Sequence, residues 1–167
     1  MIVAPTKIRR RLRGGLSIEQ AHNRAAIAAM FDLAGAAPPD DLSDRAKCFL
    51  MAYWSDDPIG VAGLETQVDA ALMRPLFVLQ SMRRRGVGSA LVRAVRVAAH
   101  TRGARSLYAI VPFARAGYLA RFGFAETGGA ELVEAFSEIL QQPLGSHPHG
   151  PCRVVCMDIS RDGLIER

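Results

Sequence analysis

Short apolar runs separated by polar turn signals occupy the middle of the chain and predict β-strands. Three such runs follow one another at 47–54, 59–67 and 70–79. The polar segment SDDP separates the first two, and the short step at Val68 and Asp69 separates the second two. Connections this short favour an antiparallel meander.

Apolar residues at helical spacing predict helices on either side of this meander. In residues 17–34, Ser17 can cap a helix and Gln20 completes a capping box. A stronger helix is predicted over 86–101, where one side is apolar and the opposite side carries Arg93 and polar residues. The remaining predicted elements are an edge strand at 7–12, a buried strand at 105–111, a short helix at 114–122, another helix at 131–140 and a final strand at 152–159.

The order of these elements predicts the fold class. A run of strands followed by alternating strands and helices indicates a mixed α/β sheet flanked by helices. A chain of 167 residues is long enough for one domain with a full hydrophobic core. We therefore expect a single domain over residues 1–167, with the basic segment 1–5 poorly ordered.

Composition and charge narrow the function classes. Half of the residues are hydrophobic, which excludes an intrinsically disordered protein. No apolar run is long enough to cross a bilayer and the opening segment lacks a secretory signal, so we expect a cytoplasmic protein without membrane contact. The net charge is +5, and only Lys7 and Lys47 are lysines, so arginine dominates. Such a balance suits an anionic ligand, either nucleic acid or a phosphorylated cofactor.

The three cysteines are too few and too scattered for a disulfide framework. Cys152 and Cys156 share one face of a predicted strand, and Cys48 lies far from them in sequence. Together with the nearby histidines they do not have the spacing of a zinc site. We expect ordinary free thiols and no metal.

The stretch SMRRRGVGSALV, residues 81–92, combines a predicted strand end, two glycines and the start of a helix. Gly86 and Gly88 permit close approach of a ligand to the backbone. The first N–H groups of the helix have no partner inside it, and together with the helix dipole they favour an anion. The three preceding arginines add long-range attraction, so the stretch is a candidate phosphate loop.

The glycine spacing excludes a P-loop and a dinucleotide fingerprint, because the Lys-Ser/Thr ending and the third glycine are missing. Arg83, Gly86 and Gly88 form R-x-x-G-x-G, which resembles the acetyl-CoA signature of the GNAT N-acetyltransferases. Downstream, YLARFGF resembles the second motif of that family. The predicted strand RSLYAIV lies between the two motifs, as a strand does in the family. The segments AIAAMFDLAGAAPPDDL, GVAGLE, ALMRPLFV and EAFSEI more loosely resemble the arsenic-resistance branch.

The resemblance implies a GNAT-type acyl-CoA acyltransferase fold, with a mixed and mostly antiparallel central sheet. It also implies transfer of an acetyl group from acetyl-CoA to the primary amine of a small molecule, such as an amino acid or a toxic amino-acid analogue, by direct attack in a ternary complex. Backbone groups on the strand before the loop would hold the pantetheine, and the loop would hold the pyrophosphate. The cofactor-binding residues implied in this way are Phe77, Val78, Leu79, Arg83, Arg84, Arg85, Gly86, Val87, Gly88 and Ser89.

Two residues are candidates for proton transfer. Glu65 lies within an apolar strand, where it is either a general base or a carboxylate paired with Arg74 on the neighbouring strand. Many family members place a tyrosine acid four residues before the glycine of Gly-Phe, where this chain has Leu119. Tyr118 is one residue away and is rotated by about 100° along a helix. Tyr118 is therefore either a displaced acid or an aromatic core residue.

Several alternatives remain open at this level. With Leu119 at the acid position, the protein can be an acetyl-CoA-binding module or sensor with little catalysis. A nucleic-acid-binding function is the weakest alternative, because the aromatic residues are not interleaved with the arginines. His147 and His149 lie in a predicted loop at 141–151, where they either border the acceptor pocket or are solvated. An exposed edge at the last predicted strand would permit a homodimer through sheet pairing.

Overall fold

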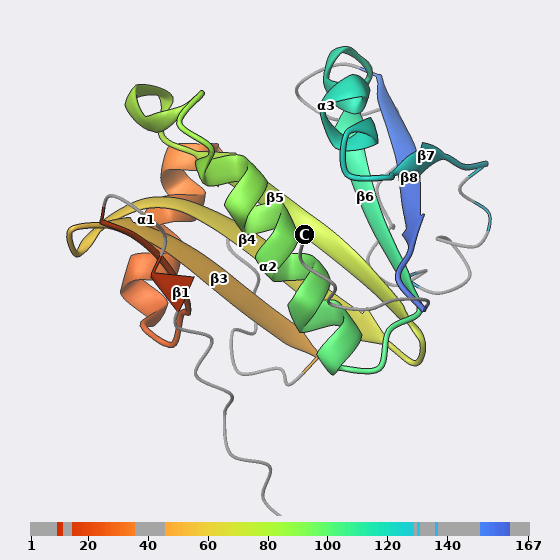
Figure 1. Ribbon diagram of the computed structural model, residues 1–167, viewed down its shortest axis with the longest axis horizontal. Coiled ribbons are helices and arrows are strands. Elements are labelled where there is room, and N and C mark those ends of the chain that lie inside the picture. The colour runs from red at the N-terminus through yellow and green to blue at the C-terminus, as the bar shows by residue number, and fades with distance from the viewer. Residues whose placement is uncertain are drawn as a thin grey trace, which may run out of the picture. The chain divides into compact units, whose positions relative to one another are not determined.

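The computed structural model describes residues 10–11, 15–35, 46–128, 130, 136 and 151–160. Its eight described strands form one sheet in the order β1-β2-β3-β4-β5-β6-β8-β7 (Figure 1). The strands are β1 Arg10–Arg11, β2 Leu16–Gln20, β3 Lys47–Trp54, β4 Asp57–Gln67, β5 Ala70–Val78, β6 Ser106–Pro112, β7 Ala125–Glu126 and β8 Cys152–Asp158. β5 and β6 pair in parallel, whereas the pairs β1–β2, β2–β3, β6–β8 and β7–β8 are antiparallel. The predicted mixed, mostly antiparallel sheet is confirmed.

The described helices are short or amphipathic. They are α1 Arg24–Ala34, η1 Gln80–Met82, α2 Val87–Thr101, η2 Phe113–Arg115 and α3 Ala116–Ala120. In the part of the chain that the structure describes, no helix has the length and apolar character needed to cross a membrane. The predicted helix over 86–101 is confirmed, and its apolar stripe of Leu91, Val92, Val95 and Ala99 is fully buried.

The chain divides into two compact units. The first comprises Met1–Leu64 and Pro75–Val95, and the second comprises Glu65–Arg74 and Arg96–Arg167. The boundary passes through β4, β5 and α2, so each of these elements contributes residues to both units.

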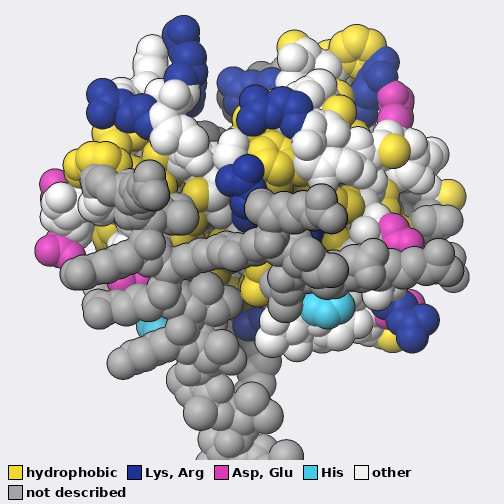
Figure 2. Space-filling view, viewed as in Figure 1, with side chains coloured by type: hydrophobic (Ala, Val, Ile, Leu, Met, Phe, Trp, Pro, Cys, Tyr) yellow, Lys and Arg dark blue, Asp and Glu magenta, His cyan; other side chains and the backbone are white. Residues whose placement is uncertain are grey.

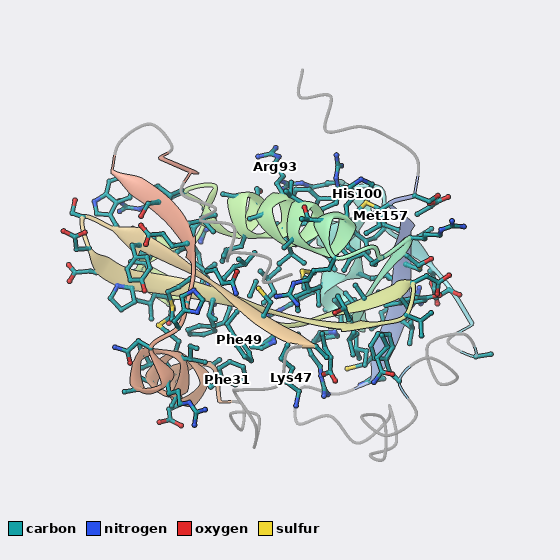
Figure 3. All side chains as sticks on the ribbon, turned by 90° about the horizontal axis from the view of Figure 1, so that it is seen from below. Phe31, Lys47, Phe49, Arg93, His100 and Met157 are labelled. Atoms are coloured by element: carbon teal, nitrogen blue, oxygen red, sulfur yellow. The ribbon has the colours of Figure 1, made fainter. Side chains whose placement is uncertain are left out.

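In the first unit, helices cover both faces of β4. Val61 packs into a cluster with Ile27 and Phe31 of α1. The rings of Phe31 and Phe49 lie edge-on, with their centroids 5.6 Å apart (Figure 3). The next residue along the strand, Gly60, faces the opposite way, toward Leu91 of α2. Alternation along one strand therefore places α1 and α2 on opposite faces of the sheet, as Figure 3 shows.

The predicted start of the first helix is wrong. Residues 16–20 form β2 instead, in which Leu16 and Ile18 are buried and Ser17 lies opposite Tyr53 of β3. The helix begins after Asn23, whose side chain accepts hydrogen bonds from the N–H groups of the second and third helical residues at 3.0 and 3.2 Å. Ile18 fits both a helical and an alternating pattern, and pairing with β3 decides between them.

In the second unit, β6, β8 and the first residues of β5 carry a core on one face. This cluster consists of Ala70, Leu72, Tyr108, Phe136 and Val154. Met157 of β8 faces the other side, where its sulfur lies 3.7 Å from the position of a Cβ on Gly123, just after α3. The strands predicted at 105–111 and 152–159 are confirmed within one or two residues.

Two further predictions concern the exposed edge of the last strand and the helix at 131–140. β8 is not an exposed edge over its whole length, because β7 pairs with it at Val155 and Cys156 and the Thr127 N–H donates to the Val154 carbonyl at 3.1 Å. The predicted helix at 131–140 lies outside the described residues except for Phe136, which is helical and buried.

Candidate functional site

The segment between β5 and α2 turns sharply at two positions with left-handed backbone. Arg84 has φ 60° and Gly86 has φ 81°. A Cβ built on Gly86 would meet no atom within 4 Å, so the glycine faces open space. Glycine adopts this backbone without strain, whereas arginine does so at a cost of about 1 kcal/mol.

The first turn of α2 directs backbone donors toward this loop. Val87 is buried and anchors the helix start. The first bond of the helical ladder runs from the Ala90 N–H to the Gly86 carbonyl at 2.9 Å. The N–H groups of Val87 and Gly88 precede that bond and have no acceptor within the helix. These donors and the positive end of the helix dipole make the loop suitable for an anionic group.

Three consecutive arginines precede these donors in the loop. Arg83, Arg84 and Arg85 are all exposed, and Figure 2 shows Lys and Arg side chains gathered over the loop where α2 begins. Arg83 differs from the other two because its Nε atom donates to the Val78 carbonyl at 3.0 Å. Sequence reasoning placed Arg83 among the phosphate contacts and missed this bond, for which the sequence carries no signal.

The end of β5 lies tightly against β4. A Cβ on Gly60 would lie 2.8 Å from the Phe77 carbonyl oxygen and 3.3 Å from Val78 Cγ2. The Leu79 N–H donates to the Ile59 carbonyl at 2.9 Å. Backbone groups alternate in direction along a strand, so the N–H and C=O of Val78 point away from β4.

The arrangement of a sheet strand, a glycine turn and a helix start can be compared with known proteins. The model described as the acetyltransferase (GNAT) family matches residues 16–124, well over half of the chain. The chain belongs to the GNAT acetyltransferase family. The family match includes the loop and α2, and it ends at the Gly-Phe of the second motif.

Solved structures of GNAT proteins share the fold at low identity. N-acetylglutamate synthase from Neisseria gonorrhoeae, complexed with coenzyme A and N-acetyl-glutamate, is 19% identical with a TM-score of 0.69. The match covers 87% of this chain, which spans only about a third of that protein (35%). The ribosomal-protein-S18-alanine N-acetyltransferase from Escherichia coli is 16% identical with a TM-score of 0.65, and the match covers 91% of this chain and 99% of that one. Among curated proteins, none matches the chain.

The candidate GNAT base, Glu65, belongs to the second unit together with Arg74. Glu65 is 8% exposed, the one charged side chain among the buried residues that the structure describes. Arg74 follows the last residue of β5 that pairs with β6. Arg74 is an exposed residue, yet the protein around its guanidinium partly removes water and lowers its pKa, while the charge of Glu65 acts in the opposite direction. The two charges therefore interact.

The second candidate for proton transfer lies on α3. Leu119, at the position where many GNAT proteins have tyrosine, is 1% exposed and belongs to the core. Tyr118 is half-buried, with its ring edge-on to Phe122 at 5.5 Å and the Arg121 guanidinium 5.1 Å from the ring centre. Leu119 therefore lies in the core, whereas the side chain of the preceding residue, Tyr118, lies in an aromatic cluster outside it.

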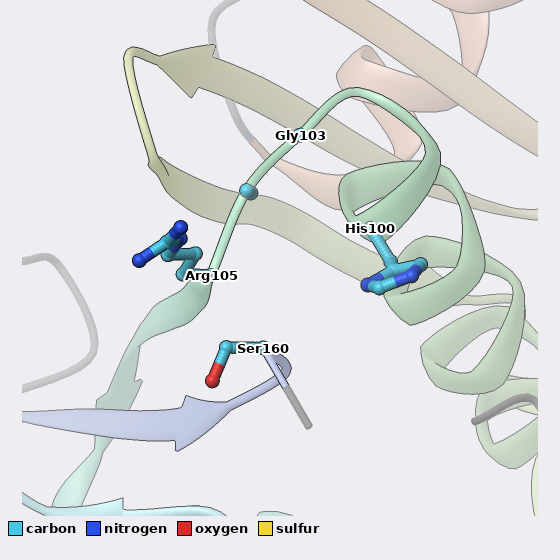
Figure 4. Close-up of a pocket in the computed structure, with 5 residues that line it drawn as sticks. His100, Gly103, Arg105 and Ser160 are labelled. Atoms are coloured by element: carbon cyan, nitrogen blue, oxygen red, sulfur yellow. The ribbon is translucent and has the colours of Figure 1, made fainter. Parts of the chain in front are cut away.

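A cavity of about 390 Å³ occurs at the C-terminal end of α2, lined by His100, Gly103, Ala104, Arg105 and Ser160 (Figure 4). It includes none of the predicted site residues. His147 and His149 lie outside the described residues. Within the described ranges, no group of three or more His, Cys, Asp or Glu side chains could hold a metal ion, and none of the three cysteines forms a disulfide bond.

Proposed function

We propose that the protein transfers an acetyl group from acetyl-CoA to the primary amine of a small molecule. The observation that carries this proposal is the glycine turn at the start of α2. Gly86 faces open space just before the N–H groups of Val87 and Gly88, and exposed arginines precede it in the loop. A pyrophosphate needs this combination of backbone donors, room and positive charge.

Two groups of residues in the first unit would bind different parts of acetyl-CoA. The loop from Arg83 to Ser89 would hold the pyrophosphate, and the backbone of Phe77, Val78 and Leu79 would accompany the pantetheine. Of these three strand residues, Val78 is the best placed, because the Leu79 N–H already donates to Ile59. Acetyl-CoA supplies the activated acetyl group when bound.

Glu65 is proposed as the general base. An alkylamine has a pKa near 10 and must lose a proton before its nitrogen can attack a carbonyl carbon. A buried carboxylate can accept that proton directly or through a water molecule. The charge of Arg74 interacts with that of Glu65, so the proposed base has a cationic neighbour.

The acceptor is proposed to be an amino acid or a close analogue. An amino acid presents a carboxylate next to its amine, and Arg74 and Glu65 offer the complementary charges on neighbouring strands. Arginine binds a carboxylate through two parallel hydrogen bonds. The similar N-acetylglutamate synthase, whose structure holds N-acetyl-glutamate, gives further support to this class of acceptor.

A second candidate function is an acetyl-CoA-binding module without efficient chemistry. The burial of Leu119 favours it, because the side chain at the usual acid position belongs to the core. In an active enzyme, Tyr118 or water would have to protonate the departing thiolate. The cytoplasmic location, the lack of a nucleic-acid partner, the single domain and the homodimer stay predictions.

Two measurements test these proposals. Calorimetry with acetyl-CoA should show binding, and its absence would contradict both the enzyme and the binding module. Thiol release should then be followed with pairs of acceptors, each an amino acid and the amine that lacks its carboxylate. Arg74→Met should lower kcat/KM more for the amino acid than for the matched amine, because only the amino acid also loses the partner of its carboxylate. Glu65→Gln should remove the pH dependence of kcat/KM that deprotonation of the base produces.

A further inference from the structure

Arg83 folds back onto the strand that precedes it. Its Nε atom donates to the carbonyl of Val78, the last residue of β5, at 3.0 Å. The backbone between them forms a tight turn, with the Met82 N–H donating to the Leu79 carbonyl at 2.9 Å and the Arg83 N–H to the Gln80 carbonyl at 3.3 Å. One side chain thus closes the turn between the strand and the glycine loop.

The bonded carbonyl belongs to the side of β5 that β4 does not use. The Leu79 N–H points to β4, where it bonds to Ile59, and strand alternation directs the Val78 groups the other way. Pairing between β5 and β6 ends at Met73 and Ala109, several residues before Val78. Neither described ladder therefore holds the Val78 carbonyl, and the Arg83 side chain does.

We propose that Arg83 is a positioning residue, which holds the end of β5 and the glycine loop in one fixed relation so that both parts of acetyl-CoA meet their sites together. This inference rests on the proposed function. The Nε bond orients the Val78 backbone, whose N–H then remains directed toward the pantetheine arm. Arg83 is exposed as a residue, and its planar guanidinium carries further N–H donors on the two Nη atoms.

The proposal differs from a simple phosphate contact in one measurable respect. A residue that only attracts phosphate matters for donors that carry phosphate. A residue that orients the strand matters for every donor whose pantetheine arm binds there. Acetyl-CoA and S-acetylpantetheine, which lacks the phosphates and the adenosine, therefore separate the two roles.

The experiment measures kcat/KM of Arg83→Met with both donors, together with the Kd of CoA and of pantetheine by calorimetry. We expect a loss of about tenfold with each donor, as one hydrogen bond to an oriented group warrants. Arg85→Met should lose efficiency with acetyl-CoA alone. The exposed Arg93 on α2 (Figure 3) supplies the control, because Arg93→Met should change neither donor.

The outcomes separate this inference from the proposed function. If the unmodified protein binds neither CoA nor pantetheine, the proposed function is wrong. If it binds both and Arg83→Met weakens only CoA, the positioning role is wrong. Circular dichroism and the thermal midpoint verify the fold of each variant. Should Arg83→Met not fold, Arg83→Lys, which keeps the charge but lacks the Nε donor, is judged by the same two outcomes.

Discussion

A Cβ atom on Gly60 of β4 would lie 2.8 Å from the carbonyl oxygen of Phe77 on β5. No side chain avoids this overlap by rotating, because the Cβ position is set by the backbone and the obstacle is backbone as well. Glycine at this point in a strand therefore marks a close approach of two strands. The approach occurs where β5 leads into the candidate cofactor loop.

Gly60→Ala is expected to destabilise the protein by about 1–3 kcal/mol, as overpacking does when the backbone must shift. Urea unfolding measures the difference. Gly117→Ala is the matched control, because a Cβ there meets nothing within 4 Å and the residue lies in α3. Equal stability of Gly60→Ala and the unmodified protein would show that the strands separate without cost.

Gly86→Ala should weaken CoA binding by about tenfold or more, which is about 1.4 kcal/mol of binding free energy, while the protein stays folded. The new Cβ enters the open space proposed for the pyrophosphate. Gly35→Ala, at the end of α1, has the same left-handed strain, with φ 67° and nothing within 4 Å. Calorimetry should find unchanged CoA binding for Gly35→Ala, and an equal loss in both variants would point to strain alone.

Asn23→Ala should cost about 1 kcal/mol of stability, the usual loss on removing a helix N-cap. Its side-chain oxygen accepts from the N–H groups of Ala25 and Ala26. Ser17→Ala, at the cap that the sequence predicted, should cost less than about 0.5 kcal/mol, because the partly buried Ser17 lies in β2 and caps no helix there. Thermal or urea unfolding of the two variants compares the caps directly, and a larger loss at Ser17 would contradict the observed helix start.

Tyr53→Phe should alter how stability depends on pH in alkaline solution. Burial, and to a lesser extent the charge of Glu19, raises the pKa of Tyr53 above its ordinary value of 10.0. The unfolded chain then ionises first, so the stabilising contribution is complete below pH 10 and is lost as pH rises toward the folded pKa. Urea unfolding from pH 7 to pH 11 should show a steeper decline for the unmodified protein than for Tyr53→Phe. Parallel curves would contradict the shift.

Much of the fold follows from local patterns in the sequence. β3 begins and ends where its apolar run does, and α2 follows its apolar stripe, because turn residues and periodicity act over a few residues. The glycine loop was recognisable for the same reason, since Gly86 and Gly88 stand between a strand and a helix. The sequence left two roles open for Glu65, a general base or a carboxylate paired with Arg74. In the structure the charges of the two residues interact.

Tertiary structure decided what local patterns left open. Residues 16–20 could continue a helix or form a strand, and pairing with β3 made them β2. Leu119 and Tyr118 differ by one step along α3, and only packing determined that Leu119 enters the core. The bond from Arg83 to Val78 depends on where a turn places a long side chain. The sequence by itself determined the elements and the loop, while contacts between distant residues determined which side chains are available for chemistry.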